Sequence, residues 1–246
     1  MPSNRGAHPE DAEQFGPTQR PRLRAAVRDL SWLCTRGYGR SSARELVGNR
    51  YRLKRRQRNA VGRSACSDNA RARRLQVRVR PQKVAGRRVD IDAFNVLITL
   101  EAALGGAYLF VGRDTAYRDV NPLEGTYRVV RQTDPAISLL ADTLQASAPK
   151  NTVWHLDQSV SNVGRVKAKL EDGANSWTVV VRDHVDDVLC ESENLVVTSD
   201  SAVLDACGSW LPLEALIHAR HIPDANLVDL RPDGERSKIL RSIRPK

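Results

Sequence analysis

The chain has 246 residues, with 39 Lys and Arg against 29 Asp and Glu, so its formal net charge is +10. This length can bury a real core, and a 41% share of hydrophobic residues argues against a wholly disordered chain. No apolar run approaches the roughly 18 residues that a membrane-spanning helix needs, so we expect no membrane protein. The first 21 residues lack the apolar stretch of a secretory signal, and the four cysteines form no C-x-x-C pair. We therefore expect a reducing, cytoplasmic location without disulfides or a zinc site.

Positive charge is concentrated in one part of the chain. Residues 20–88 contain 22 Lys and Arg but only 3 Asp and Glu, a net charge of +19, whereas residues 89–246 contain 16 and 23, a net charge of −7. Pairing within the basic segment cannot neutralise such an excess. We expect this segment to bind a polyanion, with RNA or DNA favoured over the acidic half of the chain, a ribosomal surface or anionic lipid.

The same shifts in composition predict the domain organisation. Residues 1–21 carry no periodic apolar pattern and are expected to form a disordered tail. Residues 22–80 are predicted to form a small, basic, all-helical module, because apolar residues recur there at three- and four-residue steps. A linker with Pro81 and Gly86 follows, and residues 89–246 are predicted to form a second domain.

One helical stretch of the basic module has an apolar stripe, which runs from Leu53 through Val61 to Ala65 and is expected to be buried. Trp32 is likewise expected in the core. The face opposite the stripe presents the cations that we expect to contact nucleic acid: Arg50, Arg52, Lys54, Arg55, Arg56 and Arg58.

Residues 89–246 alternate short apolar segments with amphipathic segments. This alternation predicts an α/β fold with a mostly parallel sheet. In open sheets of this kind, ligands bind beyond the carboxyl ends of the strands. The candidate strands are 89–91, 108–111, 152–156, 177–181 and 195–197, and the candidate helices are 96–104, 134–146, 160–170 and 185–190.

Acidic residues follow several of these candidate strands. Asp90 and Asp92 end the first strand, Asp157 ends the third, Asp200 follows the last, and Asp186 begins the helix after the fourth. Each acid alone is explained as a helix N-cap. Several carboxylates at one sheet edge repel one another, so together they indicate bound cations. Oxygen ligands suit Mg²⁺ or Mn²⁺ rather than zinc, and two such ions can promote phosphodiester cleavage.

Three short motifs resemble those of NYN domains, which belong to the PIN-like nuclease superfamily. Residues 92–95 (DAFN) follow an apolar strand and are similar to the D-G-Y-N opening, with alanine in place of the usual glycine. Residues 186–189 (DDVL) resemble the acidic helix start, and residues 197–200 (VTSD) resemble the late T-S-D motif. The resemblance covers about residues 89–210 and implies an NYN-type topology and metal-dependent cleavage of RNA.

The resemblance also implies roles for individual residues. Asp92, Asp186 and Asp200 correspond to metal ligands, Asp157 is a fourth acid, and Asn95 is expected to orient Asp92.

The segment 159–165 (SVSNVGR) follows Asp157 and is not explained by the NYN pattern. It predicts either an ordinary capped turn or a phosphate site made of serine hydroxyls, backbone N–H groups and Arg165. Arg113 and Arg165 are the candidates for stabilising charge on a phosphate.

The whole chain is also similar to a prokaryotic family known as domain of unknown function 434. The similarity rests on residues 28–33 (RDLSWL), 36–39 (RGYG) and 46–52 (LVGNRYR), followed by a D-x-x-N module. It spans about residues 22–215 and supplies an architecture but no activity.

Together these patterns predict a metal-dependent nuclease that hydrolyses RNA and is recruited to it by the Arg-rich module. A non-catalytic RNA- or DNA-binding adaptor is an alternative, in which the acids point apart or pair with arginines. A small-molecule phosphatase acting through Asp90 and Asp92, which have D-x-D spacing, is a weaker one.

Overall fold

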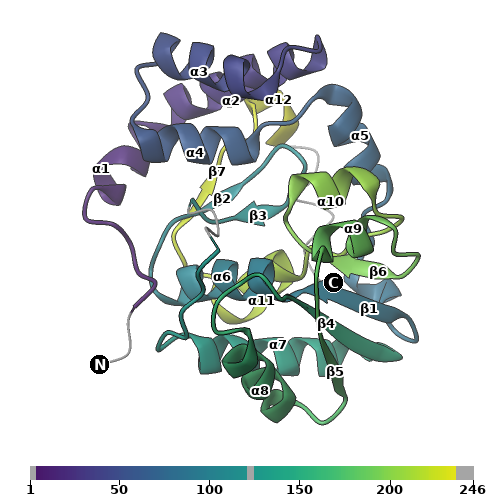
Figure 1. The fold of residues 1–246 in the computed structure, drawn as a ribbon. Helices are drawn as coiled ribbons and strands as arrows, with labels where there is room; N and C mark the ends of the chain where they lie inside the picture. Colours follow the sequence, from purple (N-terminus) through teal and green to yellow (C-terminus); the bar gives the residue numbers. More distant parts are fainter. Residues whose placement is uncertain (1–3, 121–124, 237–246) are drawn as a thin grey trace.

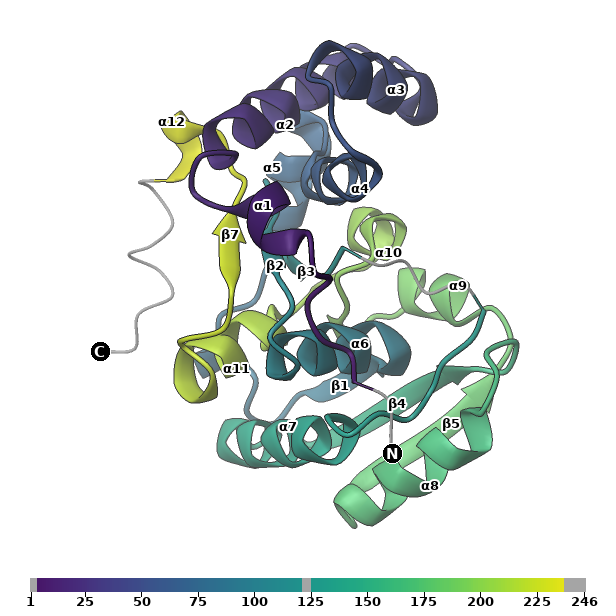
Figure 2. The same cartoon turned by 90° about the vertical axis from the view of Figure 1, so that its left-hand side faces the viewer.

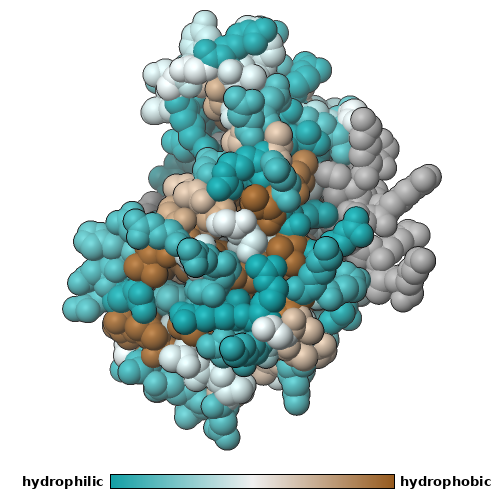
Figure 3. Space-filling model, turned by 90° about the vertical axis from the view of Figure 1, so that its right-hand side faces the viewer, coloured by the Kyte–Doolittle hydropathy of each residue, from teal (hydrophilic) through white to brown (hydrophobic). Residues whose placement is uncertain are grey.

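The computed structural model describes residues 4–120 and 125–236. Helices of the basic segment lie together at one end of the molecule, a three-stranded sheet lies beneath them, and a four-stranded sheet with its own helices forms the other end (Figure 1). Along this part of the chain, no helix is both long and apolar enough to cross a membrane. On the face shown in Figure 3, hydrophobic residues form small separate patches among hydrophilic ones.

The basic segment forms a layer of helices, as the apolar spacing predicts. Leu23, Val27 and Leu30 lie one turn apart and are all buried. Gly37, with φ +81°, allows the turn that follows the first long helix. Trp32 was expected in the core, but it is 52% exposed on the outer side, where the Arg36 guanidinium stacks on its ring. The helices are α2 (Arg20–Thr35), α3 (Arg40–Arg50), α4 (Arg55–Ser64) and α5 (Asp68–Gln76).

Residues 4–21 pack against the molecule instead of forming the predicted disordered tail. Helix α1 (Asp11–Phe15) buries Phe15, whose ring lies 4.7 Å from that of Phe110. Asp11 accepts two hydrogen bonds from the Arg56 guanidinium, at 2.7 and 2.9 Å. Figure 2 shows the segment before α1 running across helix α6, where Arg5 donates to Glu101 at 2.9 Å. These contacts are made by single side chains, so the sequence shows no periodic apolar pattern that would predict them. Residues 1–3 of the predicted tail lie outside the described residues.

The four-stranded sheet is entirely parallel, which confirms the predicted mixed α/β fold with a mostly parallel central sheet. Its order is β5 (Trp177–Arg182), β4 (Asn151–Asp157), β1 (Arg88–Asp92) and β6 (Leu195–Val197). One face packs on α6 (Ala93–Leu104), α7 (Thr133–Ser147), α8 (Val163–Gly173) and α11 (Leu213–His221). The other face packs on α9 (Val185–Cys190) and α10 (Ser201–Ala206).

A second, three-stranded sheet joins the helical layer to the rest of the molecule. The predicted strand at 108–111 lies in this sheet as β2 (Leu109–Val111), between antiparallel β3 (Tyr117–Arg118) and parallel β7 (Leu227–Asp229). Phe110 and Val228 belong to the same buried cluster as the apolar stripes of α2 and α4. The helices of the basic segment therefore share a core with residues beyond the predicted boundary at 80. The remaining elements are η1 (Pro81–Lys83) and α12 (Asp233–Arg236).

Buried ion pairs also hold the helical layer to the second sheet. Arg74 of α5 donates to Asp114 at 2.6 Å, and Arg118 donates to both oxygens of the same carboxylate at 2.9 and 2.7 Å. All three side chains are no more than 2% exposed. Acids from other parts of the chain pair with further cations of the basic segment, so part of its charge excess is neutralised within the protein. These pairs are Arg24–Asp233, Arg56–Asp11, Arg63–Asp119 and Arg71–Glu235.

Candidate functional site

The sheet topology brings the acids that follow its strands to one edge. Asp92 ends β1 and Asp157 ends β4, which is the parallel neighbour of β1. Strand β6 lies on the other side of β1 and leads to Asp200, the N-cap of α10. Asp186 lies in the first turn of α9, which follows β5. Parallel strands have their carboxyl ends on the same side, so four separate elements deliver carboxylates to one place.

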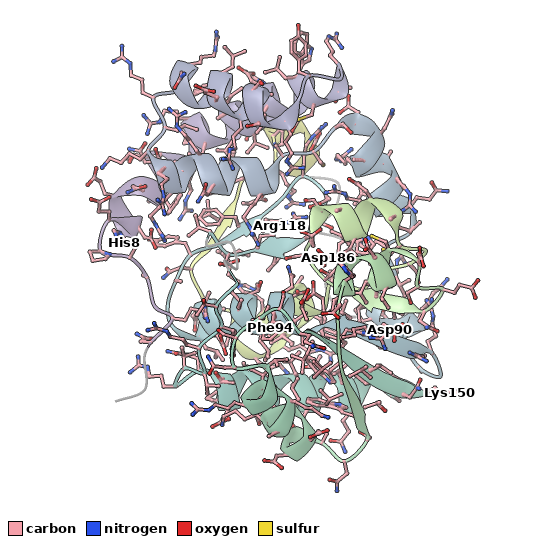
Figure 4. All side chains as sticks on the ribbon, in the orientation of Figure 1. His8, Asp90, Phe94, Arg118, Lys150 and Asp186 are labelled. Carbon is pink, nitrogen blue, oxygen red and sulfur yellow. The ribbon has the colours of Figure 1, made fainter. Side chains whose placement is uncertain are left out.

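A cavity of about 300 Å³, the carboxylate cavity, lies at this edge. In Figure 4, Asp186, one of its lining residues, lies above the four-stranded sheet and below Arg118 of the second sheet, while Phe94, another lining residue, is level with Asp90 of β1. The sequence-predicted residues in its wall are Asp92, Asn95, Asp157, Asp186 and Asp200, and they are joined there by Arg63 and Asp119.

Asp92 is the most buried of the four predicted acids, with 9% exposure. Its Oδ2 accepts a hydrogen bond from the Thr198 hydroxyl at 2.9 Å, and its Oδ1 accepts one from the backbone N–H of Asn95 at 3.3 Å. Burial, together with the negative charges of Asp186 and Asp200, raises the pKa of Asp92 to about 7, against the lowering effect of these hydrogen bonds. A proton or a cation is therefore favoured at this carboxyl near neutral pH.

The Asn95 side chain has a different role from the one that the NYN resemblance implies. Its Oδ1 accepts hydrogen bonds from both the backbone N–H and the hydroxyl of Ser199, each at 2.8 Å. Asn95 therefore fixes the turn between β6 and α10, while the Thr198 hydroxyl orients Asp92. Thr198 and Ser199 are the central residues of the 197–200 motif, so that motif contains the orienting groups.

The other predicted acids are less buried than Asp92, and two of them, Asp157 and Asp200, accept hydrogen bonds from nearby backbone N–H groups. Asp200 Oδ1 accepts from the backbone N–H groups of Ala202 and Val203 at 2.7 and 3.2 Å, and Asp157 Oδ1 accepts from that of Ser159 at 2.8 Å. The capping and turn roles that such acids often have are thus present here too. Asp186 is exposed at the cavity, and partial burial and the charges of Asp200 and Asp157 raise its pKa.

Sequence reasoning missed three charged groups of this region. Asp119 follows β3, and the rule that found the other acids would have found it had this two-residue strand been recognised. Arg63 comes from the helical layer, and its Nη2 lies 3.2 Å from Asp119 Oδ1. Glu214 of α11 is 3% exposed, and burial together with the charge of Asp92 raises its pKa to about 7. Nothing in the local sequence marks Arg63 or Glu214.

Two other acid and arginine candidates lie outside the carboxylate cavity. Asp90 is held by Ser192, Asn194 and Arg88 at 2.8 to 3.0 Å, and it is not among the residues that line the cavity. The pairing of Asp90 with Asp92 that a D-x-D phosphatase requires is therefore missing. Arg113 binds Glu235, Asp68 and the carbonyl of Cys66, so it joins structural elements instead of facing the cavity.

The cations predicted to bind nucleic acid are not part of the cavity wall. Arg165 is exposed on α8, and the segment before it is a turn in which Asn162, with φ +64°, donates to the carbonyl of Tyr127. Arg56 donates hydrogen bonds to Asp11. Arg58 donates to the Asn49 side chain and to the carbonyl of Leu53. The four remaining cations are exposed and lie at the end of α3, in the turn after it and at the start of α4: Arg50, Arg52, Lys54 and Arg55.

Comparison with known proteins places most of this chain in one family. The family model described as "Domain of unknown function (DUF5616)" matches residues 81–216, which is more than half of the chain. The chain belongs to this family. A second model, "Protein of unknown function (DUF434)", matches residues 22–76. The resemblance to domain of unknown function 434 thus holds for the helical segment, while the D-x-x-N module lies in the DUF5616 segment.

One curated relative extends across both segments. The chain is 28% identical to "Uncharacterized protein MJ0935" of Methanocaldococcus jannaschii over an aligned length of 190 residues; the alignment covers 74% of this chain and 88% of the relative. No solved structure matches the chain significantly. The DUF434 match ends at residue 76, and the DUF5616 match begins at residue 81. The boundary between them therefore lies between the helical layer and β1.

The carboxylates of the DUF5616 segment share a cavity without forming a finished metal centre. In the described ranges 4–120 and 125–236, no three His, Cys, Asp or Glu side chains are arranged as a group that could hold a metal ion. The donor chemistry nevertheless fits a hard divalent cation, because every acid at the cavity offers oxygen and the pKa of Asp92 is raised by its neighbours.

Proposed function

We propose that this protein hydrolyses phosphodiester bonds of RNA with Mg²⁺ or Mn²⁺ bound at the carboxylate cavity. The observation that supports this proposal is the convergence of Asp92, Asp157, Asp186 and Asp200 from four elements on one cavity. A PIN-like, NYN-type topology is part of the proposal. It is supported by the position of the acids at the carboxyl ends of parallel strands, which is where the NYN-like motifs would place them.

The metal requirement is compatible with the arrangement of the carboxylates. Mg²⁺ usually keeps several waters and is held by one or two carboxylates together with substrate phosphates. A preformed set of three protein ligands is therefore not needed before substrate arrives. When bound, such a cation supplies Lewis-acid polarisation of the scissile phosphate and activation of a water.

The residues of the chain would hold and orient these components. Thr198 fixes one oxygen of Asp92, and Asn95 fixes the backbone that carries Asp200. The Arg63 guanidinium faces the same cavity and can donate to phosphate oxygens, which partly offsets the repulsion between substrate and carboxylates. Because the pKa of Asp92 is about 7, its carboxyl binds a cation readily only when the proton is lost.

Metal binding should consequently depend on pH. In metal-free protein, the pKa of Asp92 is higher in the folded than in the unfolded state. The stability that Asp92 contributes is therefore lost as pH rises from the pKa of the unfolded chain through about 7. A divalent cation offsets this loss, so we expect Mg²⁺ or Mn²⁺ to raise the Tm more at pH 8 than at pH 6. Thermal unfolding at both pH values measures the effect, and an equal shift, or none, would contradict it.

The activity itself is tested with labelled single-stranded RNA and purified protein. We expect fragments with Mn²⁺ and intact RNA with EDTA. Turnover of an aryl phosphate without RNA cleavage would instead support the phosphatase. A non-catalytic adaptor is the second candidate, because the Arg63–Asp119 pair shows that one acid of the cavity is neutralised by an arginine. RNA binding without cleavage under any metal condition would favour it and end the nuclease proposal.

A further inference from the structure

Three hollows of the surface meet at Arg63. One is the carboxylate cavity. The second, of about 350 Å³, lies between α3 and α4 and is called the arginine hollow; its lining is Arg40, Ser41, Arg44, Asn59, Gly62 and Arg63. The third, of about 380 Å³, lies between the helical layer and α10 and shares Arg40 and Arg63 with the arginine hollow and Asp200 with the carboxylate cavity. The three hollows are therefore adjacent and lie between the acids and the start of α3.

The arginine hollow carries positive charge that the protein does not balance locally. Arg40 and Arg44 are exposed, and neither forms a salt bridge within the described part of the chain. Arg40 donates to the carbonyl of Gly62 at 2.7 Å, and the absence of a side chain at Gly62 lets Arg44 lie against α4, because a Cβ there would be 2.9 Å from Arg44 Cδ. Arg40 and Arg44 therefore both line the hollow beside Arg63.

The environment of Arg63 also favours binding of an anion beside these arginines. Its Nε is buried and has no hydrogen-bond partner in the described part of the chain. Burial lowers its pKa, and the positive charges of Arg118 and Arg40 lower it further, while Asp119 and Asp200 act in the opposite direction. An anion placed between Arg40, Arg44 and Arg63 would relieve this repulsion and could accept several charge-assisted hydrogen bonds.

We propose that the arginine hollow binds a backbone phosphate of a single-stranded nucleic acid, next to the phosphodiester that enters the carboxylate cavity. This inference rests on the proposed function, because the strand held in the arginine hollow is the same strand whose phosphodiester enters the carboxylate cavity. Hollows of 300 to 380 Å³ have room for one nucleotide each, whereas a duplex is too wide to enter them. We therefore expect the nucleic acid to be single-stranded where it enters the hollows. Arg40 and Arg44, which the sequence did not single out, take the role first assigned to the cations from Arg50 to Arg58.

The test measures binding without cleavage, so that it is independent of catalysis. Anisotropy of a labelled single-stranded oligonucleotide, as RNA and as DNA, is titrated with full-length protein in EDTA at several salt concentrations. The test variant is Arg40→Ala/Arg44→Ala. The control is Arg28→Ala/Arg36→Ala, which removes the same charge from exposed positions of the helical layer that line none of the three hollows. Thermal unfolding checks that both variants are folded.

We expect the test variant to bind RNA at least about 10-fold more weakly and the control to change affinity by less than about 3-fold. The slope of log K against log salt should become less negative by about 0.7 for each phosphate that the variant no longer neutralises. DNA should bind in the same way if only phosphates are recognised, and more weakly if the 2′-hydroxyl is read. Equal losses of affinity in both variants, unchanged affinity, no binding by the parent protein, or equal binding of a duplex would overturn the inference. If the parent binds through these arginines but never cleaves, only the nuclease proposal fails.

Discussion

Replacing Asp92 with Asn is expected to reduce Mn²⁺-dependent RNA cleavage by about 100- to 1,000-fold. The amide keeps an oxygen that can accept from the backbone N–H of Asn95, so the local structure is preserved. It removes the negative charge that a cation needs. It also removes a buried carboxylate whose pKa is raised to about 7, so the variant should be more stable than the parent above pH 7, by about 2 to 4 kcal/mol.

Two matched variants make this result specific. Asp200→Asn should lose activity similarly, because Asp200 lines the same cavity. Asp183→Asn removes a neighbouring exposed acid outside the cavity and should cleave RNA at the parent rate. Labelled-RNA assays measure activity, and chemical unfolding at pH 6 and pH 8 measures stability. If Asp92→Asn and the parent cleave equally, these carboxylates have no catalytic role.

Asp114→Asn is expected to destabilise the protein by about 3 to 5 kcal/mol, because it leaves the buried Arg118 without a balancing carboxylate and leaves the buried Arg74 with only the half-exposed Asp205. Arg74 and Arg118 both donate to this carboxylate, and all three groups are almost fully buried. Their positive charges hold the pKa of Asp114 well below its usual range, despite burial. This contribution to stability is complete above the unfolded pKa, near 4, and is lost as pH falls towards the folded value.

The control for this prediction is Asp205→Asn. Asp205 pairs with the same Arg74 at 2.7 Å but is 46% exposed, so its loss should cost less than about 1 kcal/mol. Urea unfolding at neutral pH measures both variants, and the difference between Asp114→Asn and the parent should shrink in acid. Equal destabilisation by the two variants would show that burial of the pair has little effect.

The convergence of the acids on one cavity could be predicted because the rule behind it is topological. Asp92, Asp157 and Asp200 each follow an apolar segment, and parallel strands place such positions at one edge regardless of side-chain detail. The partners of each acid could not be predicted in the same way. The Asn95 side chain binds Ser199 while its backbone N–H binds Asp92, and this division depends on the path of the turn after β6.

The contribution of the helical layer to the site was not predictable from the sequence. Arg63 is one of many arginines in its segment, and its position depends on how α4 packs on a core that includes Phe110 and Val228. Those contacts join residues far apart in the chain and leave no periodic pattern. Composition also predicted a disordered tail at residues 1–21, where one aromatic, Phe15, and one buried acid, Asp11, are enough to hold a short helix in place.

The position of β7 has a consequence for synthesis of the protein. Strand β7 lies beyond residue 216, where the DUF5616 match ends, yet Val228 and Leu230 complete the core under helices made early in translation. Those helices cannot bury their apolar faces completely until residues 227–230 have left the ribosome. The apolar faces of these helices therefore stay partly exposed until a strand is made that begins 207 residues after the start of α2. Expression of residues 22–76 alone would leave this surface uncovered, because Phe110, Val228 and Leu230 of its core lie outside that segment.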